Sequence, residues 1–373
     1  MKKDKSINYL KWFVVIFISI ILGAGMMYTF VKYFGSGKTI INRSEKNVNI
    51  TDTGIAEAVD KLYDSVVVVE VFENEQLAAS GTGFVYQNNK NKAYILTNNH
   101  VVSGAKKVKV MFTNKKEVEA TIEGKDEYSD LAVLSVPETS DIKVASIGDT
   151  SKSRLGDTVF TIGAPLDISY YWTVTRGVLS GKDRMVEVSS SNSNNIRQSS
   201  SDYVMKVLQT DASINSGNSG GPLANANGEV IGITNMKLVS DGVEGIGFAI
   251  PIEDAVGFAN LIISGETIKR PLLGAKMLDL TSRYNLYEQG ITLNTELTSG
   301  VVIVEIQQGS PADKAKLKRG DIIVKLDDDE VKNVATLRYH LYKHNVGDTI
   351  TISYERNGKM ETAKVKLNAT NDN

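Results

Sequence analysis

A single serine surrounded by glycines is the first feature of this sequence that could carry out chemistry. Residues 215–223 read Asn-Ser-Gly-Asn-Ser-Gly-Gly-Pro-Leu, so Ser219 has three glycines within two positions of it. Glycines allow a tight turn in which backbone N–H groups converge and a bare hydroxyl is presented. Because a serine hydroxyl is a weak nucleophile at neutral pH, this setting predicts a neighbouring base that a third group orients.

The base should be one of the three histidines in the chain. His100 follows the predicted strand 94–97, and loops held by rigid strands often carry catalytic side chains; a histidine satisfied inside a β core is the alternative. His340 and His344 have the i,i+4 spacing that places both on one helical face and could bind a metal. Because the segment lacks the glutamate of zinc-protease helices, a solvated helix face is the better interpretation, and we predict no metal and no cofactor.

The third group should be a carboxylate that holds the imidazole. Asp130 directly precedes the apolar run 131–134, although an aspartate that only caps a turn would look the same. With His100 and Ser219 it gives the chain order His, Asp, Ser, which is that of chymotrypsin-type enzymes and not of subtilisin or the α/β-hydrolases. In this interpretation Ser219 attacks a peptide carbonyl, His100 transfers the proton, and Asp130 fixes the tautomer of the histidine.

The turn around the serine should also stabilise the negative charge that develops on the substrate oxygen. The predicted donors are the backbone N–H groups of Gly217 and Ser219, while Asn218 contributes its place in the turn and no proton. Digestive proteases of the chymotrypsin type have an aspartate at the position of Asn218, and it pairs with a newly freed amine. A neutral amide cannot form that pair, so we expect no activation by cleavage and hypothesise that ordering of the loop 189–201 controls the turn.

Composition and charge limit the class of protein. Of the 373 residues, 42% are apolar and 23% are charged, which is typical of a folded protein, and the length predicts two domains. The net charge of −2 gives no electrostatic reason to bind nucleic acid. The chain has no cysteine, which excludes disulfides, thiolate metal sites and cysteine nucleophiles.

An uncharged stretch near the N-terminus predicts a membrane anchor. Residues 12–31 contain no charge, and a helix of ~20 residues crosses a bilayer core. The lysine-rich residues 1–11 should stay in the cytoplasm, so that the chain beyond the anchor faces the extracytoplasmic side of the cell membrane. Cleavage after the small residues 23–25, as in a signal peptide, is the alternative. Residues 32–54, rich in Gly, Ser, Asn and Thr, are predicted to form a linker.

Two folded regions follow the linker. Between residues 65 and 250, short β-branched runs separated by turn residues predict an antiparallel barrel or sandwich. A helix at about 252–264 ends this region. In the second region, strands alternate with predicted helices at 310–319 and 334–345.

The motifs at residues 97–102, 130–134, 211–223 and 245–251 together resemble those of the HtrA (Do-like, Deg) serine proteases, over roughly residues 55–368. The resemblance implies a mainly β protein with a two-barrel chymotrypsin-like protease domain at 55–264, a PDZ domain of α+β structure at 265–368, and one transmembrane helix ahead of them. It also implies ATP-independent, PDZ-regulated proteolysis of misfolded or damaged exported proteins, and a homotrimer. The competing hypothesis is a PDZ-bearing chaperone or scaffold with little proteolytic activity.

The resemblance also implies where the PDZ domain binds peptides. PDZ domains bind C-terminal peptides as an added strand and capture the carboxylate in a backbone nest. By resemblance, the carboxylate loop consists of Leu272, Leu273, Gly274 and Ala275. Leu337 and Leu341, one helical turn apart, would face the groove, and the alternative is that they form the core face of the helix. Residues 280–298 look like an insertion beside the groove.

The walls of the protease substrate pocket should come from the residue before the nucleophile turn and from the strand that follows the turn. These positions are Ile214, Thr234, Asn235 and Met236. Core packing is the alternative for Ile214 and Met236. Because Asp211 is the only acid in these segments, a pocket for Lys or Arg would have no evident counter-charge.

We therefore predict cleavage after small or medium aliphatic residues such as Val, Ile or Ala. Sequencing of the products from a peptide library would measure this preference. Products that end mainly in Lys or Arg would contradict the prediction.

Overall fold

The structure is a computed structural model that describes residues 4–34, 53–89, 91–139, 142–164, 170–188, 203–235, 245–266 and 268–368. The chain divides into two units, Met1–Thr51 and Asp52–Asn373. The first contains the helix α1 (Asp4–Phe34). Within it, the span Lys11–Thr29 has a mean hydropathy of 2.0 and is long and apolar enough to cross a membrane.

The second unit begins with helix α2 (Thr53–Tyr63) and a first closed barrel with the strand order β1-β2-β3-β6-β5-β4. Its strands are β1 (Val66–Glu73), β2 (Gln76–Asn88), β3 (Lys92–Asn98), β4 (Lys107–Met111), β5 (Glu117–Asp126) and β6 (Leu131–Pro137), and the short helix α3 (Asn99–Val102) follows β3. Both faces of β1 are buried: Val67 and Val69 pack in one core, and Val66 and Val68 pack in another. This follows from the period of two in a strand, with one face inside the barrel and the other against its neighbour.

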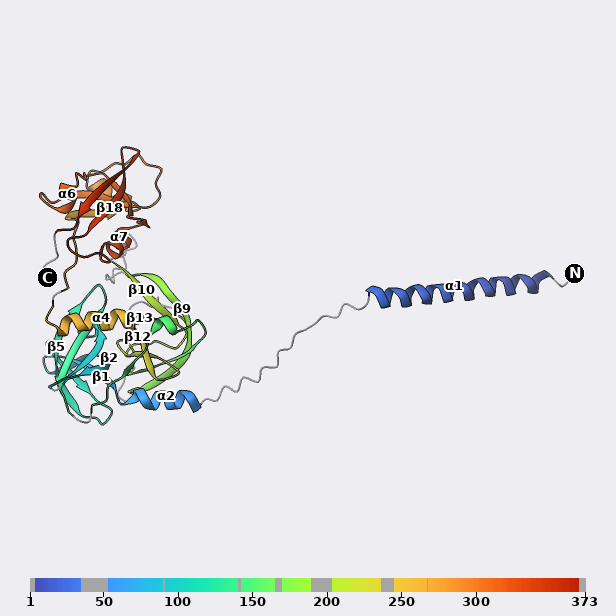
Figure 1. The fold of residues 1–373 in the computed structure, drawn as a ribbon, viewed down its shortest axis with the longest axis horizontal. Helices are drawn as coiled ribbons and strands as arrows, with labels where there is room; N and C mark the ends of the chain where they lie inside the picture. The colour runs from blue at the N-terminus through green and yellow to red at the C-terminus, as the bar shows by residue number, and fades with distance from the viewer. Residues whose placement is uncertain are drawn as a thin grey trace. The chain divides into compact units, whose positions relative to one another are not determined.

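A second barrel follows in the same unit. Its strands are β7 (Ser146–Ile147), β8 (Thr158–Gly163), β9 (Thr173–Val188), β10 (Tyr203–Thr210), β11 (Pro222–Asn225), β12 (Glu229–Thr234) and β13 (Gly247–Pro251), with a 3₁₀ turn η1 (Thr150–Lys152) after β7. The order is β11-β8-β9-β10-β13-β12-β7, and β11 also pairs with β12, which closes the ring. Helix α4 (Ile252–Ile263) contacts β5 and β6 of the first barrel and β12 and β13 of the second, so it packs across both (Figure 1).

A single core joins the two barrels. It includes Phe84 and Leu96 from the first barrel and Phe160 and Ile162 from the second, all fully buried. Burial of such side chains stabilises by about 1.5–3 kcal/mol each. The seam between the barrels is therefore a buried core to which both barrels contribute.

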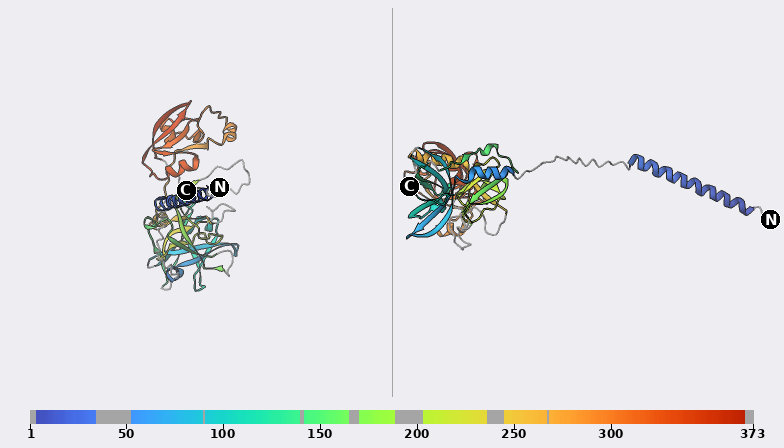
Figure 2. Two further views of the ribbon diagram at one scale, coloured as in Figure 1. Left: turned by 90° about the vertical axis from the view of Figure 1, so that its right-hand side faces the viewer. Right: turned by 90° about the horizontal axis from the view of Figure 1, so that it is seen from below.

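The C-terminal lobe, residues 268–368, is a six-stranded sheet with the order β14-β15-β16-β18-β19 and β17 paired to β16. Its elements are β14 (Ala275–Asp279), α5 (Arg283–Glu288), β15 (Val301–Ile306), α6 (Pro311–Lys314), β16 (Ile322–Leu326), β17 (Asp329–Glu330), α7 (Val334–Leu341), β18 (Thr349–Arg356) and β19 (Lys359–Lys366). Figure 2 draws the strands of this lobe in orange and red, most clearly in its left view.

The helices of the lobe begin where their capping residues predict. The Ser310 side chain accepts a hydrogen bond from Asp313 N–H, with Pro311 at the first helical position of α6. Asn333 and Thr336 form a reciprocal capping box at the start of α7. Both helices end earlier than the sequence predicts. The presumed insertion at 280–298 contains α5. Its Leu280, Leu286 and Ile291 pack against residues of β15 and β16 in a small core that is separate from the main core of the lobe.

A buried ion pair stabilises the lobe. Asp321, only 1% exposed, accepts hydrogen bonds from Nε and Nη2 of Arg356 at 2.7 and 2.6 Å. Arg356→Leu leaves this buried carboxylate without its cation, so we expect the lobe to lose about 3 kcal/mol of stability. Urea unfolding followed by a probe in the lobe would measure the loss.

The matched control is Arg154→Leu, which removes an exposed pair with Asp157. Exposed ion pairs contribute little, so the unfolding midpoint should stay unchanged within error. Equal shifts of the urea midpoint in the two variants would contradict the prediction that the buried pair stabilises the lobe more than an exposed pair does.

Candidate active site

The carboxylate of Asp130 is fully buried between the two barrels, immediately before β6. Its Oδ1 accepts the backbone N–H of His100 at 2.9 Å, and its Oδ2 accepts Nδ1–H of His100 at 2.6 Å and the side-chain amide of Asn235 at 2.7 Å. Burial removes the water that would hydrogen-bond to this carboxylate, and these three donors take its place. An isolated buried carboxylate would lack such partners. Asp130 has a φ of +51°, a left-handed conformation that aspartate tolerates better than most residues.

The pairing of β3 with β6 explains how His100 reaches Asp130. Asn98 lies opposite Leu131 in that antiparallel pair, so the end of β3 meets the start of β6. The Asp130 carbonyl also accepts hydrogen bonds from Asn99 N–H and from the Asn98 side chain, both at 3.0 Å. Because a carboxylate only accepts, Nδ1 of His100 carries a proton, and in the neutral imidazole Nε2 is then the nitrogen with the lone pair. The His100 side chain is 27% exposed, so it remains accessible from the site.

The turn that carries Ser219 lies against the segment that leads to His100. Gly220 has a φ of +85°, and a Cβ there would lie 2.2 Å from the Thr82 carbonyl oxygen and 2.3 Å from the Thr97 hydroxyl oxygen. Only glycine fits this close approach. The nucleophile turn therefore lies beside Thr97, a residue that is three positions before His100 in the chain.

Backbone hydrogen bonds give the turn a fixed shape. Asn218 N–H donates to the Asn215 carbonyl at 3.0 Å, and Gly221 N–H donates to the Asn218 carbonyl at 2.9 Å. The Asn218 side chain, 1% exposed, donates to the Ser213 carbonyl at 3.3 Å. The amide of Asn218 is thus buried within the turn, and Gly217 and Ser219 flank it.

Two residues that were expected to line the substrate pocket instead hold the site together from inside. Thr234 is fully buried and its hydroxyl donates to the Asn218 carbonyl at 2.6 Å; Asn235 is fully buried and binds Asp130. Neither side chain offers surface to a substrate. Ile214 is 9% exposed and is counted among the core residues. Met236 and the loop 189–201 lie outside the described residues.

The predicted peptide-binding residues of the lobe divide between loop and core. Gly274 has a φ of +70°, and its carbonyl accepts from Gln307 N–H at 2.9 Å. Leu273 packs in the core of the lobe, while Leu272 and Ala275 are half-buried. Leu337 and Leu341 are 0% and 4% exposed and belong to the same core. These two leucines therefore form the core face of α7, the alternative that the sequence left open.

The two remaining histidines each lie near one aspartate. Nδ1 of His340 is 2.9 Å from Oδ2 of Asp329, and Nε2 of His344 is 3.4 Å from Oδ2 of Asp327. Partial burial lowers the pKa of His340, although Asp329 acts in the opposite direction. No group of three His, Cys, Asp or Glu side chains among the described residues could hold a metal ion.

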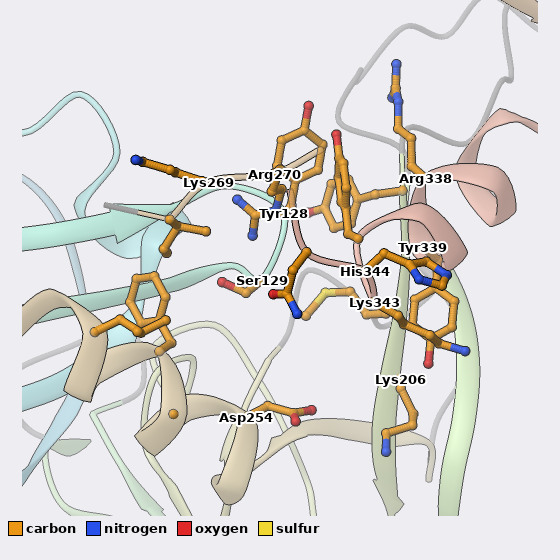
Figure 3. Close-up of a pocket in the computed structure, with 18 of the residues that line it drawn as sticks. Tyr128, Ser129, Lys206, Asp254, Lys269, Arg270, Arg338, Tyr339, Lys343 and His344 are labelled. Atoms are coloured by element: carbon orange, nitrogen blue, oxygen red, sulfur yellow. The ribbon is translucent and has the colours of Figure 1, made fainter. Parts of the chain in front are cut away.

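Arg270, which sequence reasoning missed, fixes the turn that carries Asp130. Its two terminal nitrogens each donate to one oxygen of Asp126 at 2.6 Å, a fork that suits a carboxylate. Oδ2 of Asp126 also accepts the N–H and hydroxyl of Ser129. The rings of Tyr128 and Tyr342 lie 5.0 and 5.3 Å from the guanidinium carbon. Figure 3 shows Arg270 beside Tyr128 and Ser129.

A cavity of about 1170 Å³ adjoins this cluster, lined by α4, β10 and the end of α7 (Figure 3). Asp254 lines it, and burial raises the pKa of this carboxyl even though Lys206 opposes the rise. Lys206 also pairs with Asp183 at 3.4 Å, and Lys343 pairs with Asp329 at 3.6 Å. Because acids already compensate these cations, the lining does not define the chemistry of one ligand.

Comparison with known proteins agrees with this site. The trypsin-like peptidase domain family matches residues 81–233, and the PDZ domain family matches residues 271–367. Serine protease Do-like HtrA of Bacillus subtilis (strain 168) is 44% identical over 293 residues, which cover 78% of this chain and 64% of that protein, less than two thirds of its length. Serine protease Do-like HtrA of Lactococcus lactis subsp. cremoris is 36% identical, covering 89% of this chain and 86% of the relative.

Solved structures give the same picture. The serine endoprotease from Yersinia pestis matches with a TM-score of 0.61 and 28% identity, covering 85% of this chain and 98% of that chain. The HtrA-type protease AlgW with decapeptide matches with a TM-score of 0.61 and 27% identity, covering 84% and 97%. Fold and site together define a trypsin-like serine endopeptidase with a PDZ domain, as the sequence predicts. The chain belongs to the HtrA family of Do-like serine proteases.

Asn235 is a positioning residue for Asp130, and its loss has a measurable cost. A hydrogen bond to a charged group contributes about 1.5–3 kcal/mol. Asn235→Leu should therefore lower kcat about tenfold to a hundredfold on a peptide substrate while KM changes little. The control Asn260→Leu, at an exposed position of α4, should leave kcat unchanged. A normal kcat in Asn235→Leu would exclude this role.

Proposed function

We propose that Ser219 is the nucleophile of this endopeptidase, His100 its general base and acid, and Asp130 the group that orients His100. The observation that carries the proposal is the two-point contact between Asp130 and His100, which fixes both the position and the tautomer of the imidazole. The turn with Ser219 adjoins this pair through Gly220 and Thr97.

The chemistry follows from the groups present. Ser219 Oγ attacks the carbonyl carbon of the scissile peptide bond while His100 Nε2 takes its proton, and His100 then returns the proton to the leaving amine. Asp130 stabilises the imidazolium that forms between these steps without accepting the proton itself. The N–H groups of Gly217 and Ser219 stabilise the oxyanion of the tetrahedral intermediate. Water hydrolyses the resulting acyl-enzyme by the same route.

The cellular setting in this proposal is the outer side of a membrane. Helix α1 anchors the chain, with residues 12–31 as the transmembrane segment and 32–54 as a linker; its apolar span supports this assignment. The protease domain covers 55–264 and the PDZ domain 265–368. The substrates are misfolded or damaged exported proteins. In this proposal the activity is independent of ATP, in keeping with a hydrolysis step by these three residues that consumes no nucleotide.

Two further parts of the proposal concern partners. The PDZ domain binds C-terminal peptides of other proteins, with residues 272–275 as the loop that receives the carboxylate. The positive φ of Gly274 supports this role, since such a loop needs a backbone conformation that glycine favours. The second partner is another copy of the same chain, because the assembly is a homotrimer in this proposal. Within the protease domain, Ile214 contributes to the wall of the substrate pocket.

The substitution Ser219→Ala tests the nucleophile. We expect it to abolish hydrolysis of unfolded casein and covalent labelling by a fluorophosphonate, because alanine has no hydroxyl that could attack either reagent. Ser151→Ala, at an exposed serine of η1, should keep both activities. Hydrolysis should proceed equally with and without ATP.

Mapping the labelled peptide identifies the nucleophile directly. A label on a serine other than Ser219, or casein hydrolysis that persists in Ser219→Ala, would overturn the assignment. A chaperone or scaffold with little proteolytic activity would show neither label nor hydrolysis in the unmodified protein.

A further inference from the structure

Thr82 contacts the nucleophile turn from the opposite barrel. It lies in β2 and is fully buried. Its hydroxyl donates to the Gly217 carbonyl oxygen at 2.5 Å and accepts the Ala164 N–H at 3.0 Å. Its backbone N–H donates to the Ser219 carbonyl at 2.9 Å, and its carbonyl accepts the Thr97 hydroxyl at 2.7 Å. One residue of the first barrel therefore holds two carbonyls of the turn.

Gly217 is a point of the turn where the backbone needs glycine's conformational freedom. Its φ is +99°, and glycine has no Cβ to restrict rotation. The peptide unit after Gly217 is planar, so the two groups at its ends fix its orientation. At one end the Thr82 hydroxyl holds the Gly217 carbonyl, and at the other end Asn218 N–H donates to the Asn215 carbonyl. The Thr82 hydroxyl is the side-chain contact that keeps this unit from turning over.

The next peptide unit is held from the second barrel. The Asn218 carbonyl accepts the Thr234 hydroxyl at 2.6 Å and Gly221 N–H at 2.9 Å. The N–H of Ser219 belongs to the same plane and points the opposite way, so its direction is also fixed. Two successive carbonyls are thus held by two threonine hydroxyls, one from each barrel.

We propose that the Thr82 hydroxyl is a positioning residue for the oxyanion site. By holding the carbonyl of Gly217, it fixes the peptide unit between Gly217 and Asn218, which lies between the two N–H donors, those of Gly217 and Ser219, and so sets their orientation relative to each other. Thr82 touches neither the substrate nor the reacting atoms, and it acts through the backbone of the turn. The inference rests on the proposed role of Ser219 as the nucleophile, and it extends that role to a residue 135 positions away from Gly217 in the chain.

The test is Thr82→Val, which keeps the shape and the strand preference of threonine and removes only the hydroxyl. We expect kcat on a peptide substrate to fall about 10- to 100-fold with KM changed by less than about twofold, since the loss acts in the transition state. The affinity of a peptide boronate, whose tetrahedral adduct occupies the oxyanion site, should fall in parallel. Thr82→Ser keeps the hydroxyl and should restore kcat to within about threefold of the unmodified protein.

Thr161→Val is the matched control. Thr161 is a fully buried strand threonine of β8, and among the described residues its hydroxyl has no hydrogen-bond partner. The same substitution there removes a buried hydroxyl without removing a contact to the turn. We expect an unchanged kcat and an unchanged boronate affinity. This control therefore separates the general effect of replacing a buried threonine by valine from the specific loss of the hydrogen bond to the Gly217 carbonyl.

The proposal is overturned if Thr82→Val lowers only the melting temperature and keeps kcat and boronate affinity. If Thr82→Val does not fold, Thr82→Ser and Thr82→Cys replace it, because these side chains have similar size and a thiol is a much weaker donor. Equal kcat in the two variants then overturns the proposal, and a lower kcat in Thr82→Cys supports it. Covalent labelling at Ser219 is read in every variant, so failure of this inference is distinguished from failure of the nucleophile assignment.

Discussion

The buried carboxylate of Asp130 is the constraint on which the rest of the site depends. An ionised group away from water must be surrounded by donors. Here the donors come from both barrels: His100 follows a strand of the first, and Asn235 follows a strand of the second, 105 residues from Asp130. The charge is compensated only when both barrels are folded and packed together. The catalytic arrangement is therefore a property of the seam between them and of the core that fills it.

The nucleophile turn follows the same principle with backbone groups in place of a charge. Carbonyls on both sides of Ser219 are satisfied by Thr82 from one barrel and by Thr234 from the other. Buried carbonyls without partners are costly, so these contacts also select one conformation of a glycine-rich segment that could adopt many. Precision at the site thus comes from rigid strands, while the glycines supply only the conformational freedom that the turn needs.

Sequence pattern singles out the groups proposed to do chemistry more readily than the groups that hold them. Ser219, His100 and Asp130 could be proposed from the sequence because each has a distinctive type and local setting, and because their order in the chain is informative. Thr82 and Arg270 give no local signal, since an ordinary strand threonine and a linker arginine acquire their roles only through contacts distant in sequence. The side chains of Thr234 and Asn235 were placed in the pocket wall, because the pattern of a short strand does not reveal which neighbour satisfies a polar side chain. Likewise, Leu337 and Leu341 could face a groove or a core until the packing of α7 was known.

The fork between Arg270 and Asp126 has a consequence for work with fragments. The arginine follows helix α4 and lies outside the protease domain as the sequence delimits it, yet it completes the turn that leads to Asp130. A truncated protein that stops after α4 lacks the PDZ domain and also lacks Arg270. Asp126 in its first barrel has then lost the cation that it pairs with. Differences in turnover between such a fragment and the whole chain therefore combine two changes, and a fragment extended through residue 270 separates them.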